Sequence, residues 1–258
     1  MRFVTAFTVL LLFLCPLASR AQVQTVPMYV AHKPGLSIRE KPDVKAKVLA
    51  KIPYATKISL ANEQGADTIL VNTEGFSSYF RKVTYNNTTG YIISAYLLPV
   101  PPPKATVKNL NDYLLQLSPK AGAMVEVKKG TMNNITENGT ISRKQLYKNG
   151  AEHHEFVAYE YNSDTWMIPE LTLQQVWLLL RLIPDWKDVV DEKTELPVTS
   201  KKITKKENTE FDIKVEKENW YGPEYFKKIR IEYSDGASYI IELFLLENQA
   251  VVFRGGGV

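Results

Sequence analysis

The chain has 258 residues, of which 45% are hydrophobic and 23% are charged. This composition excludes a disordered chain, a collagen-like repeat and a small domain held together by disulfides, and the length allows one or two globular domains. The formal net charge of +4 comes from 32 basic and 28 acidic residues, an even balance that argues against nucleic acid as a partner.

Residues 1–21 have the pattern of a secretory signal peptide. Arg2 supplies a positive charge, and residues 4–14 form an almost unbroken apolar run that is shorter than the roughly 20 residues of a transmembrane helix. Ser19 and Ala21 place small residues where a signal peptidase cleaves. We therefore expect a mature protein that is periplasmic or extracellular and has no transmembrane span. The alternatives are an N-terminal membrane anchor or a buried helix.

Cys15 lies inside this segment and is the only cysteine of the chain. Leu14 and Pro16 flank it, whereas a lipidated cysteine follows small residues, so we interpret Cys15 as part of the signal peptide. The mature chain would then have no disulfide, no thiolate nucleophile and no cysteine-ligated metal. Its stability would depend on an apolar core.

Residues 24–98 are expected to form a small β-barrel domain, because short runs of β-branched and aromatic residues alternate with turn residues. Pro34-Gly35 and Asn86-Asn87 mark two of the turns. Strands are predicted at residues 28–31, 36–39, 48–52, 57–60, 69–71, 80–85 and 90–93. Within this segment, residues 61–79 are expected to form either an elongated loop or an extra hairpin.

Three pieces of this segment resemble bacterial SH3-like (SH3b) domains. Residues 35–42 (GLSIREKP) are similar to the opening strand and its proline-bearing loop, residues 48–58 (VLAKIPYATKI) to the next two strands, and residues 80–97 to the closing pair. The resemblance extends over residues 29–98, although Phe80 and Tyr91 stand where the family usually has tryptophan. It implies an SH3-like barrel that recognises a peptide, a cell-wall ligand or a protein.

Three tyrosines of this domain, Tyr54, Tyr79 and Tyr96, are the candidate ligand-binding residues. Tyr54 follows Pro53 in a turn that exposes side chains at the barrel rim. Phe80 suits the core, and neighbouring strand residues face opposite sides, so Tyr79 is expected to point outward. Amphipathic rings at the rim of a small barrel bind peptides or glycans. The alternative is that these rings pack in the core.

Residues 99–104 (PVPPPK) are predicted to be a proline-rich linker. Proline lacks a backbone donor and favours the stiff polyproline II conformation. The alternative is a proline-rich edge loop inside a single domain. We place a second domain, for which the sequence shows no family resemblance, at residues 105–258.

Residues 105–258 predict an α+β domain in which an antiparallel sheet packs on one or two helices, so the whole chain is mainly β. Helices are expected at residues 110–117, after a cap at Asn109, and at 172–183, where the sequence is apolar on nearly all sides and therefore buried. Strands are expected at residues 123–127, 140–147, 155–161, 211–216, 228–233, 239–246 and 251–253. We interpret residues 191–208 as a solvated loop and Gly255-Gly256-Gly257 as a frayed end.

The second domain shows no recognisable catalytic or metal-binding pattern. His153 and His154 are adjacent, and adjacent strand residues face opposite sides, so their rings cannot easily share a metal. The acidic residues at 185–195 could form a glycosidase pair, but the preferred interpretation is a solvated charged run. We therefore predict no catalytic residue, no metal and no cofactor.

These features together predict an exported, non-catalytic binding protein of the cell envelope. The expected partner is a peptide, peptidoglycan or an envelope protein. Two other classes stay open: an enzyme with its site in residues 105–258, and a structural or assembly factor of the envelope. A pocket that joins His153 or His154 to a buried carboxylate would favour the enzyme.

Overall fold

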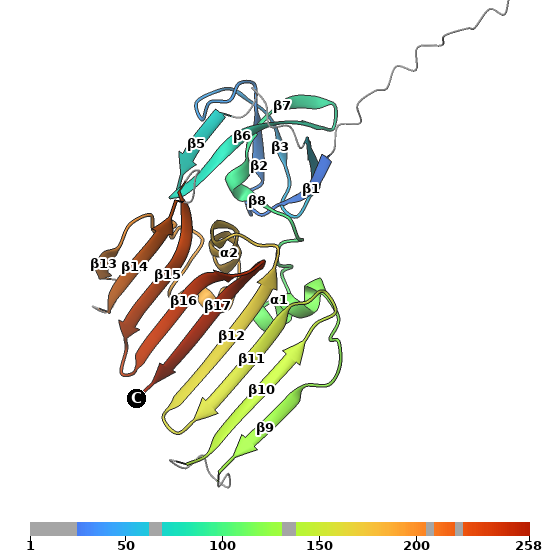
Figure 1. Ribbon diagram of the computed structural model, residues 1–258. Helices are drawn as coiled ribbons and strands as arrows, with labels where there is room; N and C mark the ends of the chain where they lie inside the picture. Colours follow the sequence, from blue (N-terminus) through green and yellow to red (C-terminus); the bar gives the residue numbers. More distant parts are fainter. Residues whose placement is uncertain (1–24, 62–68, 131–137, 205–208, 220–223) are drawn as a thin grey trace, which may run out of the picture.

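The computed structural model describes residues 25–61, 69–130, 138–204, 209–219 and 224–258 (Figure 1). The signal-peptide prediction for residues 1–21 lies outside these ranges. Within them the chain is mainly β, with two α-helices and antiparallel sheets, which confirms the predicted class. A first module (residues 25–98) and a second module (residues 105–258) are joined by the proline-rich segment (Figure 1).

The first module consists of two small sheets with the strand orders β4-β1-β8 and β3-β2-β7-β6-β5. The strands are β1 (Thr25–Val30), β2 (Leu36–Arg39), β3 (Val48–Ile52), β4 (Lys57–Ala61), β5 (Ile69–Thr73), β6 (Phe76–Tyr85), β7 (Thr88–Ile93) and β8 (Leu97–Leu98). Side chains from both sheets, among them Val30, Ile38, Ile92 and Leu98, are completely buried and form the core. Each strand that the sequence predicted for this module is present.

The stretch at residues 61–79 contains a hairpin. Strands β5 and β6 pair from Ile69 opposite Phe80 to Thr73 opposite Phe76, and Glu74-Gly75 form the turn between them. Both turn residues have a positive φ, 51° at Glu74 and 80° at Gly75, as the preferred two-residue hairpin turn requires. The hairpin alternative therefore holds for the described part, and residues 62–68 lie outside it.

The second module is built on one nine-stranded sheet with the order β13-β14-β15-β16-β17-β12-β11-β10-β9. The strands are β9 (Val125–Lys129), β10 (Thr140–Leu146), β11 (Glu152–Ala158), β12 (Tyr161–Pro169), β13 (Lys201–Thr204), β14 (Glu210–Glu218), β15 (Tyr225–Ser234), β16 (Ser238–Leu246) and β17 (Gln249–Gly257). Strand β17 pairs with β12 as well as β16. It therefore joins two runs of consecutive strands into a single sheet.

Three predictions for this sheet are wrong. Strand β12 was not predicted, and the strand expected at residues 155–161 ends at Ala158, where a turn leads into β12. Residues 201–204, interpreted as part of a solvated loop, form the edge strand β13, whose lysines suit an exposed edge. Gly255-Gly256-Gly257 is paired on both sides rather than frayed. A Cβ at Gly256 would lie 2.6 Å from Tyr239 Cδ1, so the glycine makes room for that ring.

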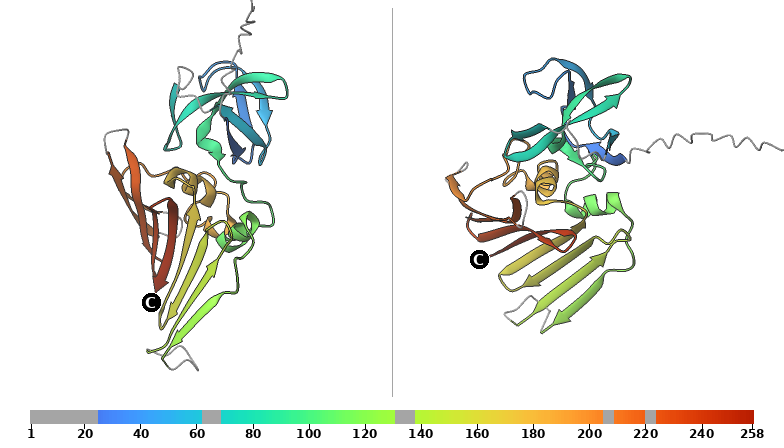
Figure 2. Two further views of the ribbon diagram at one scale, coloured as in Figure 1. Left: turned by 45° about the vertical axis from the view of Figure 1, so that its right-hand side comes forward. Right: turned by 45° about the horizontal axis from the view of Figure 1, so that its top comes forward.

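Two helices cover one face of the sheet, at the end nearest the first module (Figure 2). Helix α1 (Leu110–Leu117) begins after Asn109, whose side chain accepts a hydrogen bond from the Asp112 backbone N–H. Helix α2 (Leu173–Leu180) begins with a capping box of Thr172 and Gln175 and packs against β15 and β16. Short 3₁₀ turns follow β7 (η1, Ser94–Tyr96) and α2 (η2, Pro184–Trp186).

The proline-rich segment at residues 99–104 is held by side chains from both modules. The Tyr54 hydroxyl of the first module donates to the Pro103 carbonyl at 2.7 Å. The Tyr113 hydroxyl of α1 donates to the Pro101 carbonyl at 3.0 Å. Pro102 and Pro103 are buried. The segment therefore packs against the modules along its length, and the predicted boundary between two separately folding domains stays a prediction.

Candidate binding surfaces

Tyr79 is the predicted ligand-binding residue with the most exposed ring. It lies on β6 directly opposite Leu70 of β5, and the exposed fractions of these residues are 44% and 57%. The neighbouring Phe80 is only 3% exposed, so the alternation of the strand turns Tyr79 outward as expected. Tyr79 and Leu70 form an exposed cross-strand pair, of which sequence analysis missed the leucine.

Tyr54 and Tyr96 make contacts inside the protein. Burial, reinforced by the charge of Glu192, raises the pKa of Tyr54 to about 12, and its hydroxyl is bound to the proline-rich segment. Tyr96 is 8% exposed, its ring centroid lies 4.7 Å from that of His32, and its hydroxyl is 3.3 Å from Thr73 Oγ1. Burial is also the main cause that raises the pKa of Tyr96. The structure therefore leaves Tyr79 as the ring with free surface, and the ligand role of all three stays a prediction.

The tip of the β5–β6 hairpin is seated on the second module (Figure 1). Arg181, at the C-terminal end of α2, is 8% exposed, and its Nη1 donates to Glu74 Oε2 at 2.6 Å. The same guanidinium donates from Nε to the Glu192 carbonyl at 3.0 Å and lies 5.7 Å from the Phe76 ring centroid. The Leu196 backbone N–H donates to the Glu74 carbonyl at 2.9 Å. An ion pair and a main-chain hydrogen bond thus hold the tip.

The contact between the hairpin tip and the second module requires glycine at position 75, because no other residue would fit there. Its φ of 80° is left-handed, and a Cβ at this position would lie 2.0 Å from the Leu196 carbonyl oxygen. Beside the tip, the Ser77 backbone N–H donates to Gln174 Oε1 at 3.2 Å. The hairpin that carries the exposed Tyr79–Leu70 pair is therefore fixed in position by the second module.

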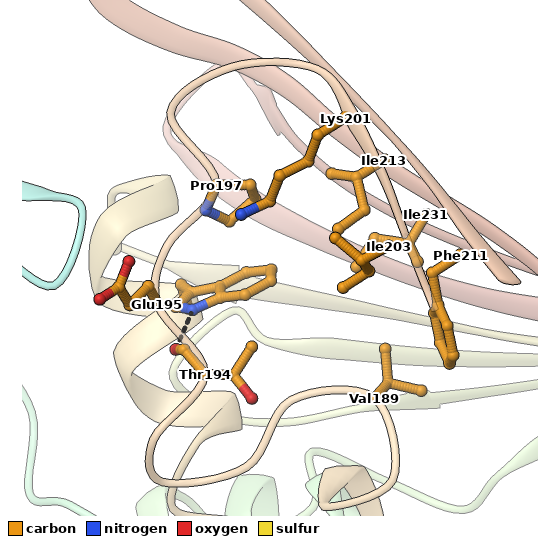
Figure 3. Close-up of a pocket in the computed structure, with 10 residues that line it drawn as sticks. Val189, Thr194, Glu195, Pro197, Lys201, Ile203, Phe211, Ile213 and Ile231 are labelled. Carbon is orange, nitrogen blue, oxygen red and sulfur yellow. Dashed lines mark hydrogen bonds between the residues drawn. The ribbon is translucent and has the colours of Figure 1, made fainter. Parts of the chain in front are cut away.

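An apolar pocket of about 190 Å³ lies between the large sheet and the segment that precedes β13 (Figure 3). Phe211, Ile213 and Ile231 of the sheet line it on one side. Trp177 of α2 also lines it, and its indole N–H donates to the Thr194 carbonyl at 3.2 Å. Sequence analysis predicted the apolar faces of α2 and the sheet, but residues 194–203, which close the pocket, belong to the stretch at 191–208 that was interpreted as a solvated loop.

A wider cleft of about 780 Å³ adjoins the apolar pocket, since Val189, Thr194 and Phe211 line both. We call it the aromatic cleft, because Phe211, Tyr233 and Tyr239 form a row across β14, β15 and β16. Their ring centroids are 4.7 Å and 4.9 Å apart, with interplanar angles of 19° and 18°. Sequence analysis placed these three residues in predicted strands, but it predicted neither the register that aligns them nor the loop that walls them in.

The two histidines of the second module lie in separate pairs. His153 Nε2 is 2.7 Å from Asp164 Oδ1, and the imidazole stacks on Trp166 with ring centroids 5.4 Å apart. His154 Nε2 is 2.7 Å from Glu152 Oε2. Among the residues that the structure describes, no group of three histidine, cysteine, aspartate or glutamate side chains could hold a metal ion.

The acidic residues at 185–195 make local contacts at the surface. Asp185 Oδ2 accepts a hydrogen bond from Arg254 Nη1 at 2.8 Å. Asp191 Oδ1 accepts one from the Thr194 hydroxyl at 2.7 Å, and Glu192 pairs with Lys33 of the first module. These carboxylates are exposed, which agrees with a charged run rather than with a buried catalytic pair.

The strand order and turns of the first module define a small β-barrel of two sheets. Residues 34–97 match the family model of the bacterial SH3 domain. This part of the chain is therefore a bacterial SH3 domain, as its motifs predicted, and such domains are typically binding modules. No curated protein and no solved structure shows a significant match to the chain. In the described ranges, no helix is long and apolar enough to cross a membrane.

Proposed function

We propose that the protein is an exported, non-catalytic binding protein of the bacterial cell envelope, whose SH3 domain recognises a cell-wall peptide. The observation that carries this proposal is the exposed pair of Tyr79 and Leu70 on the β5–β6 hairpin. Side chains directly opposite each other on antiparallel strands lie about 5 Å apart, so the two form one apolar patch. The phenol hydroxyl adds a polar contact at the edge of that patch.

The seating of the hairpin supports a binding role for this pair. A loop that orders only on binding loses conformational entropy at that moment, whereas a fixed one does not. Arg181 and Leu196 hold Glu74 at the hairpin tip, a few residues from Tyr79. The proposed ligand surface would therefore need no ordering on binding. Export rests on the signal-peptide pattern of residues 1–21.

The enzyme alternative has one observation in its favour. A surface pocket of about 370 Å³ on the sheet is lined by His154 together with Ser142, Ser163 and Thr165, the residue types of a hydrolase. The carboxylate that lines the same pocket is Glu155, which is bound by Arg143 Nη1 at 2.9 Å. A catalytic histidine needs a carboxylate that orients it next to a nucleophile. His154 Nε2 is held by Glu152 Oε2 at 2.7 Å, but Glu152 is also bound by Lys144 and lies outside the lining of this pocket, so we favour binding over catalysis.

The test is co-sedimentation of the purified protein with peptidoglycan sacculi. We expect the protein to sediment saturably, and Tyr79→Ala to weaken this binding about tenfold, in the range of interface hot-spot residues. Leu70→Ala is expected to weaken it less, because it removes a smaller contact area. The melting temperature of both variants is expected to stay unchanged, since an exposed residue leaves no cavity.

Tyr225→Ala is the matched control, because Tyr225 is a strand tyrosine with a similar exposed fraction of 43% in the second module. It is expected to sediment like the unmodified protein. If the unmodified protein stays in the supernatant, the cell wall is not the ligand and an envelope protein becomes the leading partner. Equal losses in Tyr79→Ala and Tyr225→Ala would contradict a specific role for the hairpin pair.

A further inference from the structure

Strand β9 lies at one edge of the nine-stranded sheet (Figure 1). It pairs with β10 on its inner side, and among the residues that the structure describes no strand pairs with its outer side. All of its residues are exposed. The outward N–H and C=O groups of such an edge can pair with another extended strand. We propose that this strand is β9 of a second copy, so that the chain forms a two-fold symmetric dimer through one continuous sheet.

Two-fold symmetry restricts how two copies of β9 can pair. The edge strands of identical copies run antiparallel when the two-fold axis is perpendicular to the sheet. Residues directly opposite each other in an antiparallel pair share one face of the sheet. Because side chains alternate along a strand, Val125, Val127 and Lys129 share one face of β9. Glu126 and Lys128 share the other, so each residue can lie opposite only a member of its own set.

The charges of β9 select one register from those that symmetry allows. With the axis at Val127, this residue lies opposite its own copy, and Glu126 of each copy lies opposite Lys128 of the other. Sliding the strands by two residues in one direction places Glu126 opposite Glu126, and sliding them in the other places Lys128 opposite Lys128. Opposite charges across a strand pair are stabilising and like charges are destabilising. The sequence of β9 is therefore complementary to itself at Val127.

The two charged residues can make these contacts without giving up a buried ion pair. The Lys128 side chain is 55% exposed, and its ammonium lies 3.0 Å from Glu126 Oε1 of the same strand. Glu126 is 33% exposed, and its Oε2 also lies 2.7 Å from Arg143 Nε of β10. A carboxylate has about four acceptor sites, so Glu126 can keep Arg143 while it binds Lys128 of the second copy. Exposed ion pairs contribute little affinity, and their main effect here is to select the register.

The other face of β9 contributes apolar contact. Val125 and Val127 are 62% and 48% exposed. In the dimer the two copies of Val127 meet at the axis, where β-branched side chains suit a cross-strand contact. Val125 lies opposite Lys129 of the second copy, whose aliphatic stem can cover it. Dimerisation therefore removes from water the apolar surface that the open edge exposes.

The small size of the contact indicates a weak, reversible dimer. The five residues of β9 are far fewer than the roughly 20–30 residues a side of a standard stable interface. The test is sedimentation velocity of the whole protein over a range of concentrations. We expect a monomer at about 10 µM and a substantial fraction of dimer at about 1 mM, as for a small interface.

Two single variants test the register. Glu126→Lys and Lys128→Glu each place like charges opposite each other in the dimer, and each is expected to weaken dimerisation at least about tenfold. Lys128→Glu leaves the contact between Glu126 and Arg143 in place, so it is the milder change for the sheet. The melting temperature and far-ultraviolet circular dichroism of each variant check that the fold persists.

An equimolar mixture of the two variants is the most specific sample. In a mixed dimer, two lysines of one copy lie opposite two glutamates of the other, so dimerisation is expected to return. Lys202→Glu is the matched control, because Lys202 lies on β13 at the opposite edge of the same sheet and is 66% exposed. This variant is expected to dimerise like the unmodified protein.

Three results would overturn the proposal. One is a protein that stays monomeric at about 1 mM, well above the concentration at which small interfaces associate. Another is an equal loss of dimer in Lys202→Glu and Lys128→Glu, which would remove β9 as the contact. The third is a mixture of the two folded β9 variants that stays monomeric, which would contradict the register centred on Val127.

Discussion

The SH3 domain and the second module present aromatic side chains in opposite ways. Tyr79 stands uncovered beside Leu70 on a hairpin, whereas Tyr233 and Tyr239 stand in a cleft with a loop as its wall. Both arrangements come from the same two-residue alternation of strands. The difference lies in how far each group is covered: Tyr79 and Leu70 are 44% and 57% exposed, whereas residues 187–194 line the aromatic cleft. An uncovered pair suits an extended ligand, and a walled row suits a compact one.

The two modules are also linked by the hairpin itself. The Glu74-Gly75 turn belongs to the SH3 domain, yet its carbonyl and carboxylate bind Leu196 and Arg181 of the second module. If this contact positions Tyr79, changes at the tip will alter both the SH3 surface and the coupling between the modules. The predictions below test this coupling.

The largest effect is expected from Gly75→Ala. The substitution places a Cβ 2.0 Å from the Leu196 carbonyl oxygen at a φ of 80°, so it adds a steric clash to a strained backbone. We expect a loss of about 3 kcal/mol in the free energy of unfolding, measured by urea denaturation.

Gly236→Ala separates the two causes. Gly236 has a similar φ of 69°, but nothing lies within 4 Å of a Cβ there, so only the backbone strain remains. We expect a loss of about 1 kcal/mol. Equal losses in the two variants would show that Leu196 yields without cost and that the hairpin tip is not firmly seated.

Arg181→Met tests the ion pair at the same contact. Arg181 is 8% exposed, and its loss leaves the Glu74 carboxylate and the Glu192 carbonyl without this donor. Because the Glu74 side chain is 37% exposed, water compensates in part, and we expect a loss of about 2 kcal/mol rather than the larger cost of a fully buried pair. Differential scanning calorimetry is expected to resolve separate transitions of the two modules in this variant.

Lys33→Met is the matched control, since Lys33 and Glu192 also link the modules but are 46% and 56% exposed. We expect a change within about 0.5 kcal/mol and an unaltered calorimetric profile. A split profile in both variants, or in neither, would contradict the assignment of the coupling to the buried arginine.

Sequence reasoning was strongest where local chemistry determines the structure. In the SH3 domain, turn residues such as Asn86-Asn87, both with positive φ, bound strands whose positions the sequence predicted. In the second module, β12 was missed because residues 162–165 (NSDT) are polar on both faces. Asp164 faces His153 and Arg254 across neighbouring strands, and such pairing depends on contacts far apart in the sequence.

The sites follow the same rule. The outward direction of Tyr79 could be predicted from the buried neighbour Phe80, a local argument. The contact of Tyr54 with Pro103 spans 49 residues, and no local pattern encodes it. The aromatic row could not be predicted without the register of β14, β15 and β16. The residues that wall its cleft showed only a polar pattern in the sequence.

The smallest effect concerns the charged outer face of the large sheet and its dependence on pH. Glu242 of β16 is held by Lys228 Nζ at 2.6 Å and Arg230 Nη1 at 2.5 Å. Burial raises the pKa of the Glu242 carboxyl, but the hydrogen bonds from Lys228 and Arg230 outweigh it, so the pKa is lowered from 4.5. As the pH falls, the Glu242 carboxyl therefore binds a proton in the unfolded chain before it does so in the native state. Ionised Glu242 therefore stabilises the protein above about pH 4.5 and loses this contribution as the pH falls through its native pKa.

Glu242→Gln is expected to make the free energy of unfolding fall less steeply between about pH 5 and pH 3, measured by urea denaturation at each pH. Glu232 on β15, whose pKa Arg230 also lowers, retains part of the slope. Glu210→Gln is the control, because Glu210 and its partner Lys202 are 60% and 66% exposed and such pairs contribute little. An unchanged slope in Glu242→Gln, or an equal change in Glu210→Gln, would mean that solvent screens this charged face as fully as an exposed pair. The acid sensitivity of the second module would then have to originate from other carboxylates.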